Sequence, residues 1–299
     1  MTISRQNLSV IIVTFKSEKV IHQCIENIPE KIQIIIVDNS NDRIFKQNIE
    51  KLYKNVKCIL APSNLGMGAG NNLGLRNINT EYAFILNPDV ILENDTIDEM
   101  INSSKVLNSF VIVAPISSNK KYPNYKLYKN LRPSLEDNKP FKVDCVDGYA
   151  MVLNIKRLKE LKQFDNRNYF DENFFMYLEN DDICKRLIEL NEHIYIIPKS
   201  KINHLGAKAV DMKYEYQIEM SRNWHWIWSK FYFKKKHFGF FSAFIDGIPS
   251  FFSALIKFII YFFVNKRKKD IYLHRMLGYI NALVGNTSYF RPNINDQES

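Results

Sequence analysis

The chain has 299 residues, of which 46% are hydrophobic and 13% are aromatic. This apolar material can offset the entropy cost of folding and excludes a disordered chain. Ten glycines and ten prolines are too few for a collagen-like or linker-dominated chain. The four cysteines are far apart and form no CxxC pair, so we expect neither a zinc site nor a disulfide scaffold, and the composition is typical of a reducing cytosol.

The charge is unevenly distributed along the chain, although the net formal charge is only +9. Residues 222–299 hold twelve Lys and Arg against four Asp and Glu, whereas the first 221 residues are nearly neutral. A basic segment predicts an anionic partner, either lipid headgroups or nucleic acid. The polar start of the chain and the short apolar run at residues 8–13 do not match a signal peptide.

The first half of the chain alternates strand patterns with helix patterns. Continuous apolar runs rich in β-branched residues predict buried strands, and apolar residues at helical spacing predict helices. The expected strands are residues 8–13, 32–37, 56–60, 82–86 and 110–114, and the expected helices are residues 18–28, 43–53, 66–76 and 95–107. This order predicts an α/β fold with a mostly parallel sheet flanked by helices, in which ligands bind at the carboxyl ends of the strands.

The pattern changes in the second half of the chain. Residues 117–140 are rich in Lys, Asn, Tyr and Pro and predict an excursion over the surface. A strand pattern returns at residues 143–153, a helix is expected at 181–191, and a short strand is expected at 194–197, ending at Pro198.

Two carboxylates follow strands of the expected sheet. Asp38 comes after the strand at residues 32–37, and Asp89, in Asn87-Pro88-Asp89, comes after the strand at residues 82–86. Each alone is also typical of a turn. Because the carboxyl ends of parallel strands meet at one edge, the pair predicts a crevice where a carboxylate can hold Mg²⁺ or Mn²⁺.

A glycine-rich segment at residues 64–74 raises the question of a dinucleotide-binding loop. Such a loop would need its glycines directly after the first strand, which instead runs into Thr14-Phe15-Lys16. A dehydrogenase is therefore disfavoured. We expect these glycines to let the start of a helix pack closely beneath a ligand.

Six short motifs, in this order, resemble those of family 2 glycosyltransferases, and of their rhamnosyltransferase-like branch in particular. They are Val13-Thr14-Phe15, Val37-Asp38-Asn39-Ser40, Asn64-Leu65-Gly66 with Gly70-Asn71-Asn72 and Gly74, Leu86-Asn87-Pro88-Asp89-Val90, Val146-Asp147-Gly148-Tyr149-Ala150-Met151 and Phe174-Phe175-Met176-Tyr177-Leu178-Glu179. The resemblance covers about residues 7–210 and implies the GT-A fold, which has a Rossmann-like sheet.

The resemblance also implies roles for single residues. Those expected to bind the nucleotide-sugar donor are Thr14, Asp38, Asn64, Gly70, Asn87, Asp147 and Gly148. Asp89 would hold a divalent metal, Mg²⁺ or Mn²⁺, with His204 beside it, although His204 can equally be a buried structural histidine.

One motif departs from the family pattern. Members usually show Glu-Asp-x-Asp at the start of the helix after the Met-Tyr segment, and this chain has Glu179-Asn180-Asp181-Asp182. The second position is often the general base, and the amide of Asn180 cannot accept a proton at neutral pH. We expect Glu179 to be the base and Asp182 to be the second candidate, while carboxylates here are also common as helix caps.

The implied activity is a metal-dependent, inverting hexosyl transfer. A sugar such as rhamnose would move from a nucleoside-diphosphate sugar to a hydroxyl of a lipid-linked or polysaccharide acceptor during cell-surface glycan synthesis. Two other classes stay open. Asn87 and Asn180 are compatible with a non-catalytic nucleotide-sugar-binding or scaffold protein. A nucleic-acid-binding protein is disfavoured, because no reader motif is present and the basic residues flank apolar segments.

The expected organisation is a GT-A domain at residues 1–220, with a nucleotide-binding half at about 7–115 and an acceptor half at about 140–210, followed by a basic and apolar helical tail at 221–299. In the tail, residues 238–264 are strongly apolar but contain Asp246 and Lys257, and Pro249 lies between them.

Three interpretations of this tail remain: helices lying in the membrane interface, a buried helical core or homodimer contact, and a true span, which needs roughly 20 apolar residues. We expect the first, with the protein held peripherally on the cytoplasmic side of the cell membrane by an anionic lipid surface.

Overall fold

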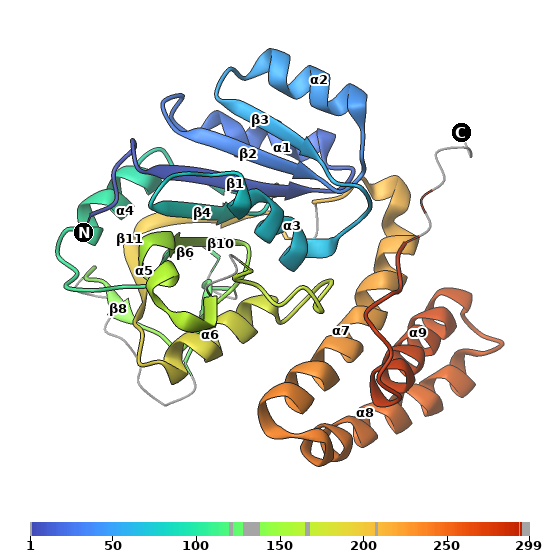
Figure 1. The fold of residues 1–299 in the computed structure, drawn as a ribbon. Helices are drawn as coiled ribbons and strands as arrows, with labels where there is room; N and C mark the ends of the chain where they lie inside the picture. The colour runs from blue at the N-terminus through green and yellow to red at the C-terminus, as the bar shows by residue number, and fades with distance from the viewer. Residues whose placement is uncertain are drawn as a thin grey trace. The chain divides into compact units, whose positions relative to one another are not determined.

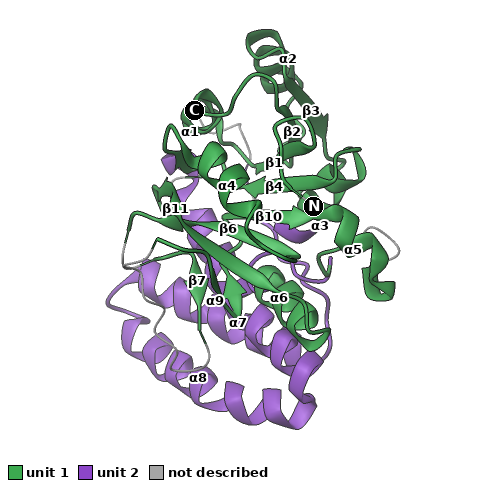
Figure 2. Ribbon diagram, turned by 90° about the vertical axis from the view of Figure 1, so that its left-hand side faces the viewer, with its two compact units in different colours: residues 1–65, 69–171, 179–210 green, residues 66–68, 172–178, 211–299 purple. Residues whose placement is uncertain are grey.

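The computed structural model describes residues 2–119, 122–127, 138–164, 168–206, 209–292 and 294. The chain divides into two compact units, coloured separately in Figure 2. Unit 1 comprises residues 1–65, 69–171 and 179–210, and unit 2 comprises residues 66–68, 172–178 and 211–299. Short segments from the middle of the sequence therefore belong with the C-terminal helices. The functional division at residue 220 stays a proposal.

A nine-stranded sheet forms the centre of unit 1 (Figure 1). Its path runs β3 (Val56–Leu60), β2 (Gln33–Asp38), β1 (Leu8–Thr14), β4 (Tyr82–Leu86), β10 (Ala150–Asn154), β6 (Ile112–Ser117), β11 (Ile194–His204) and β5 (Val90–Leu92), and β8 (Phe141–Lys142) pairs with β11. The first four strands are parallel, as expected. Beyond β4 the sheet is mixed, because β10 runs antiparallel to both β4 and β6, and β11 runs antiparallel to β5. The predicted α/β fold class is confirmed.

Helices cover both faces of this sheet, and the alternation of β1 explains why. Val10 and Ile12 of β1 share a core with Ile21 and Ile25 of helix α1, whereas Ile11 faces Gly74 of helix α3. A strand buried on both faces is apolar at nearly every position, and β1 departs from this only at Ser9 and Thr14. The helices of this unit are α1 (Glu18–Glu26), α2 (Arg43–Leu52), most of α3 (Gly66–Arg76), α4 (Thr96–Ser104), α5 (Ile155–Glu160), the 3₁₀ turn at Lys162–Phe164 and α6 (Glu179–Glu189).

Strand β11 continues through Pro198, so the expectation that it ends there is wrong. It pairs with β6 up to Ile197 and resumes pairing at Lys201 after a shift in register. Proline lacks a backbone donor and is tolerated at such irregularities. The hydroxyl of Ser200 donates to the carbonyl of Thr96 at 2.8 Å, which fixes the shift. The strand then reaches His204, which lies opposite Val90 of β5.

The expected surface excursion contains a small second sheet. β7 (Tyr125–Lys126) pairs antiparallel with β9 (Cys145–Val146), which places Lys126 opposite Cys145. Residues 128–137 of the excursion lie outside the described residues. The expected strand at 143–153 is in fact two strands, β9 and β10, separated by the segment that contains Asp147 and Gly148.

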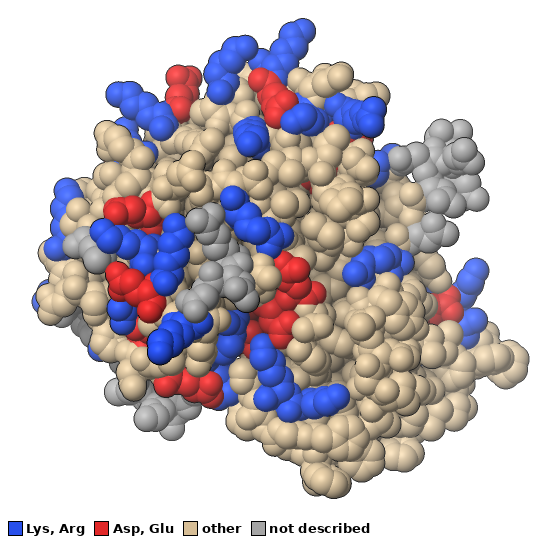
Figure 3. Space-filling view, viewed as in Figure 1, with Lys and Arg blue, Asp and Glu red and all other residues tan. Residues whose placement is uncertain are grey.

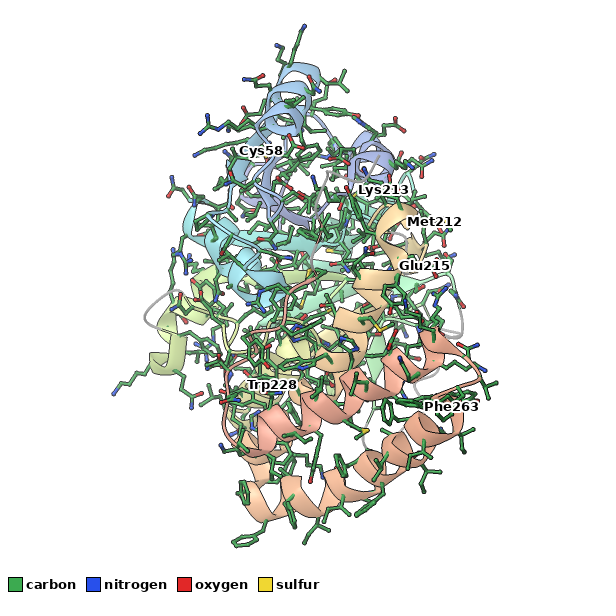
Figure 4. The ribbon with its side chains drawn as sticks, turned by 90° about the vertical axis from the view of Figure 1, so that its right-hand side faces the viewer. Cys58, Met212, Lys213, Glu215, Trp228 and Phe263 are labelled. Carbon is green, nitrogen blue, oxygen red and sulfur yellow. The ribbon has the colours of Figure 1, made fainter. Side chains whose placement is uncertain are left out.

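Unit 2 is built from three helices, which follow a 3₁₀ turn at Met212–Tyr214: α7 (Glu215–Phe238), α8 (Phe240–Tyr261) and α9 (Lys266–Leu283). Their shared core contains Trp224, Trp228 and Phe231 of α7. Gly278 brings α9 close to α7, because a Cβ there would lie 2.4 Å from the carbonyl oxygen of Trp224. α8 is a single helix despite Pro249 inside it. In Figure 4, Trp228 lies among the helices and Phe263 lies at the end of α8.

Candidate active site

Two of the expected donor-binding residues meet at the carboxyl ends of β1 and β2. Thr14 and Asp38 are opposite one another in the parallel register. The Thr14 hydroxyl donates to Oδ1 of Asp38 at 3.1 Å, and the backbone N–H of Asp42 donates to Oδ2 at 2.9 Å. Burial raises the pKa of Asp38, although the hydrogen bonds from Asp42, Ser40 and Thr14 oppose the shift. The carboxylate is held in a fixed orientation at the sheet edge where ligands bind.

The glycine-rich helix packs directly on β1. A Cβ at Gly70 would lie 2.9 Å from Cγ1 of Val13, so only glycine allows this approach. Just before the helix, the backbone N–H of Leu65, the neighbour of Asn64, donates to the side-chain oxygen of Asn39 at 3.3 Å. Because Asn39 directly follows Asp38, Asn64 lies beside the end of β2. The structure thus brings Asn64 and Gly70 to the same edge as Thr14 and Asp38.

A second group of side chains surrounds Asp89, which follows β4 at the same edge of the sheet. Nε2 of His204 lies 3.5 Å from Oδ1 of Asp89, too far for a well-formed hydrogen bond. The His204 ring stacks on Tyr149 with centroids 4.1 Å apart. Oδ1 of Asp89 and Oδ1 of Asn87 are both buried without a hydrogen-bond partner. Buried oxygens of this kind call for an explanation, and a role in holding a cation is one.

The residues around Asp89 fit a divalent metal whose remaining ligands would come from the substrate. Among the described residues, no group of three His, Cys, Asp or Glu side chains is arranged to hold a metal alone. Mg²⁺ is usually held by one or two carboxylates together with substrate phosphates and water, rather than by a full protein cage. Asp89 and His204 would supply the protein ligands, and diphosphate oxygens the remainder.

A lysine that the sequence did not single out connects two acidic residues on the acceptor side. Nζ of Lys126 lies 2.8 Å and 3.0 Å from the two carboxylate oxygens of Asp181 and 3.8 Å from Oδ1 of Asp147. Burial alone would lower the pKa of Lys126, but the charge and hydrogen bond of Asp181 outweigh it and the pKa is raised. Burial raises the pKa of Asp147, and Asp181 adds to this effect, while Lys126 and His204 oppose it.

Glu179 lies at the start of α6 beside this network. Its Oε2 is buried without a hydrogen-bond partner, and a Cβ on Gly148 would lie 3.6 Å from its Oε1. Burial, reinforced by the charge of Asp181, raises the pKa of Glu179 to about 7, while a hydrogen bond from its own backbone and the charge of Lys126 oppose the shift. A carboxylate of this kind can exchange a proton near neutral pH.

The two residues that follow in the motif have different surroundings. The amide of Asn180 donates to the carbonyl oxygen of Val146 at 2.9 Å, which ties α6 to β9. Asp182 is fully buried, and its Oδ2 accepts from Nε of Arg186 at 2.8 Å. Arg186 also donates to the carbonyl of Tyr169 at 2.6 Å. Asp182 therefore lies in a structural ion pair, whereas an oxygen of Glu179 lacks a partner.

The backbone before Glu179 is strained. Tyr177 and Leu178 both have positive φ angles, 70° and 67°, which non-glycine residues rarely adopt. Such strain gathers at functional sites, where the surrounding structure holds the chain in place. No sequence signal identified these conformations, since neither residue is glycine or asparagine. Lys126 was equally hidden, because its position depends on the pairing of β7 with β9.

In an α/β sheet, ligands bind at the carboxyl ends of the parallel strands, which is where the structure places these carboxylates. The family model described as Glycosyl transferase family 2 matches residues 9–188, which is more than half of the chain. The chain belongs to this family. The rhamnosyltransferase-like branch is not singled out by this match.

One curated relative is the low-salt glycan biosynthesis hexosyltransferase Agl10 of Haloferax volcanii, 28% identical over 209 residues. The match spans 63% of this chain and 64% of that protein, which is less than two thirds of its length.

Solved structures share the GT-A fold at low identity. The mannosyltransferase PcManGT of Pyrobaculum calidifontis, in complex with GDP-Man and Mn²⁺, aligns with a TM-score of 0.56 at 12% identity and covers 94% of this chain and 88% of its own. S. aureus TarS 1–349 aligns with a TM-score of 0.51 at 14% identity, covering 97% and 94%. GalNAc-T7 with UDP, GalNAc and Mn²⁺ aligns with a TM-score of 0.53 at 14% identity, covering 66% and 42%.

Proposed function

We propose that the chain is an inverting hexosyltransferase that moves a sugar from a nucleoside-diphosphate sugar to an acceptor hydroxyl. The observation that carries the proposal is Glu179, a buried carboxylate with one unpartnered oxygen beside Gly148, in a member of a glycosyltransferase family. Membership supports the transfer, and the hexosyltransferase relative supports the class of sugar. Rhamnose is the proposed sugar, by resemblance alone.

Donor binding is assigned to the edge formed by β1, β2 and β4. Asp38, oriented by Thr14, would bind the ribose or the base, and Asn64 and Gly70 would line the same edge. Asp89 and His204 would hold Mg²⁺ or Mn²⁺ together with the diphosphate. The metal, when bound, would neutralise negative charge on the leaving diphosphate. The Mn²⁺ named with two of the structural neighbours supports this choice of cofactor.

The transfer itself is a single displacement. The acceptor oxygen attacks the anomeric carbon, the bond from that carbon to the diphosphate oxygen breaks, and the hydroxyl proton passes to Glu179. Asp147 and Gly148 would line the sugar and acceptor positions. We assign Asp182 to structure, because it is buried against Arg186.

The test is donor turnover by the purified full-length chain. Nucleoside diphosphates and their sugars would be screened with Mn²⁺ by thermal shift, since native-state ligands raise stability, and diphosphate release would then be measured. Asp89→Asn should weaken donor binding and remove its Mn²⁺ dependence. Asp95→Asn is the matched control, because Asp95 is exposed and its side chain caps no backbone N–H of α4. Unchanged metal-dependent binding by Asp89→Asn would refute the metal site.

A non-catalytic sugar-nucleotide-binding protein is the second candidate, and Asn180 favours it. The usual base position is an amide whose N–H₂ is already engaged with Val146. Donor binding without turnover or hydrolysis, for every sugar and acceptor tried, would select this reading.

We further propose that unit 2 holds the protein on a membrane. Among the described residues, α8 is the one helix long and apolar enough to cross a bilayer by length and composition, and only 11% of its most apolar window is buried. Figure 3 shows few charged side chains in the region where Figure 1 places α8. The relative's role in glycan biosynthesis supports a lipid-linked or polysaccharide acceptor.

We favour a helix that lies on the membrane over one that spans it. Ala243 and Ala254 of α8 are buried, so one side of α8 is already used for packing within unit 2. α7 and α9 are joined by ion pairs from Arg267 to Glu215 and Glu219, and a span would take this charged bundle toward the bilayer core. We place the protein on the cytoplasmic face, where nucleotide sugars are available.

A further inference from the structure

A pocket opens between α7 and α8 in unit 2. It is partly open to solvent. Its polar lining comes from Lys230 and Lys234 of α7 and from Asp246 and Ser250 of α8, and Tyr279 of α9 also lines it. None of these residues belongs to the sugar-transfer site.

The charges of this pocket favour an anion. Two lysines against one aspartate leave one net positive charge. Nζ of Lys234 lies 3.6 Å from Oδ2 of Asp246, and the two side chains are 37% and 52% exposed. An ion pair this long and this exposed contributes little to stability, so a phosphate can replace Asp246 as the partner of Lys234. Ser250 lines the same pocket, and its hydroxyl is a neutral hydrogen-bond donor.

The position of the pocket on α8 relates it to the exposed apolar face. Large apolar side chains recur on one side of the helix and just beyond it, and each is at least half exposed: Phe241, Ile245, Phe252, Ile256, Ile259 and Phe263. We call this set the apolar stripe. Asp246 and Lys257 are about three turns apart and project from a common edge beside the stripe. The charges that appeared to interrupt the segment therefore leave the stripe intact.

A helix that lies in the interface inserts its apolar face roughly 5–10 Å into the boundary between headgroups and acyl chains. Its lateral edges are then level with the phosphates. The edge with Asp246 is also the edge on which the pocket opens, so lipid phosphates would lie beside Lys230 and Lys234.

We propose that the pocket of Lys230, Lys234 and Ser250 binds the phosphate of an anionic phospholipid in the bilayer on which the apolar stripe rests. The inference rests on the proposed membrane association of unit 2. The pocket would make unit 2 prefer anionic over neutral phospholipids, a preference that the apolar stripe alone would not provide.

The test uses the full-length chain and vesicles of phosphatidylcholine, with and without phosphatidylglycerol. Wild type should bind both and should bind the anionic vesicles more tightly. Lys230→Met with Lys234→Met should weaken binding to anionic vesicles by roughly fivefold per lysine and leave binding to neutral vesicles unchanged. Asp246→Asn removes the competing carboxylate and should strengthen anionic binding by a few fold.

The matched control is Lys235→Met with Lys236→Met, which removes the same charge from the same helix at positions that do not line the pocket. An equal loss in the two double variants would overturn the pocket, because general attraction would then explain the preference. No preference for anionic vesicles in wild type would also overturn it, while membrane association would stand. If neither vesicle binds, or if the stripe instead joins two copies of the chain in solution, both proposals fail.

Discussion

The side-chain amide of Asn180 donates to the carbonyl oxygen of Val146 at 2.9 Å, and in doing so ties the start of α6 to the strand before the Asp147-Gly148 segment. A carboxylate cannot make this bond unless it is protonated. Asn180→Asp should therefore destabilise the protein by about 1–3 kcal/mol, the usual cost of losing a buried hydrogen bond. Urea unfolding measures this change.

Asn102→Asp on α4 is the control for this substitution. Oδ1 of Asn102 only accepts, from Lys105 at 3.0 Å, and aspartate retains that role. If Asn180→Asp were as stable as this control and more active than wild type, position 180 would face the acceptor and its bond to Val146 would be incidental.

Replacing Glu179 with glutamine should reduce turnover by about 10²–10⁴-fold while donor affinity stays nearly constant, because removal of a base affects the chemical step. In the wild-type protein the base has to be ionised, and its pKa is raised to about 7. Activity should therefore rise with pH through about 7 and then level off. Rates under saturating donor across a pH series provide the measurement. A dead Asp182→Asn beside an active Glu179→Gln would reverse the assignment.

Glu179→Gln lowers turnover but should stabilise the folded protein at neutral and alkaline pH. A carboxyl group whose pKa is higher in the folded state stabilises that state at low pH, and this contribution is lost as pH rises through the folded pKa. For Glu179 the loss falls between about pH 4.5 and about pH 7. Glu179→Gln should gain about 3 kcal/mol relative to wild type between acid and mildly alkaline pH. If the difference in unfolding free energy between Glu179→Gln and wild type were the same at acid and at mildly alkaline pH, the burial of the Glu179 carboxylate would be contradicted.

Lys126 should act on the base through Asp181. Removing its charge as Lys126→Met leaves Asp181 and Asp147 without their shared cation, which makes ionisation of Glu179 harder. The acid limb of the pH–rate profile should move upward by roughly half to one pH unit. Lys142→Met, an exposed lysine on β8, should leave the profile in place. If Lys126→Met lowered the turnover rate without moving the acid limb of the pH–rate profile, Lys126 would have only a structural role.

The ion pair of Asp182 with Arg186 should matter for folding. Arg186→Met leaves a fully buried carboxylate without its guanidinium, and breaking such pairs costs about 3–5 kcal/mol. Lys185→Met, the neighbouring position in α6, removes the partly exposed ion pair with Glu189 and should cost less than about 1 kcal/mol. Thermal unfolding of the two variants compares them directly. Equal melting temperatures would show that Asp182 does not need Arg186.

The sequence predicted the parallel part of the fold well, because β1 and β2 are buried on both faces over most of their length and are mainly apolar. It also placed Asp38 and Asp89 after strands that end at one edge, since the carboxyl ends of parallel strands coincide. It could not place Lys126 or extend β11 to His204. Those positions depend on pairing between distant segments, and local pattern carries no information about such pairing.

The shift in register within β11 makes this strand intolerant of changes in length. Loops usually accept insertions and deletions, but one residue added or removed between Ile197 and Lys201 would reverse the direction of every later side chain in the strand. The side chain of His204 would then face away from Asp89, although His204 itself was not substituted. We expect natural variation in this stretch to consist of substitutions alone, so its length would be as diagnostic of a working site as the histidine itself.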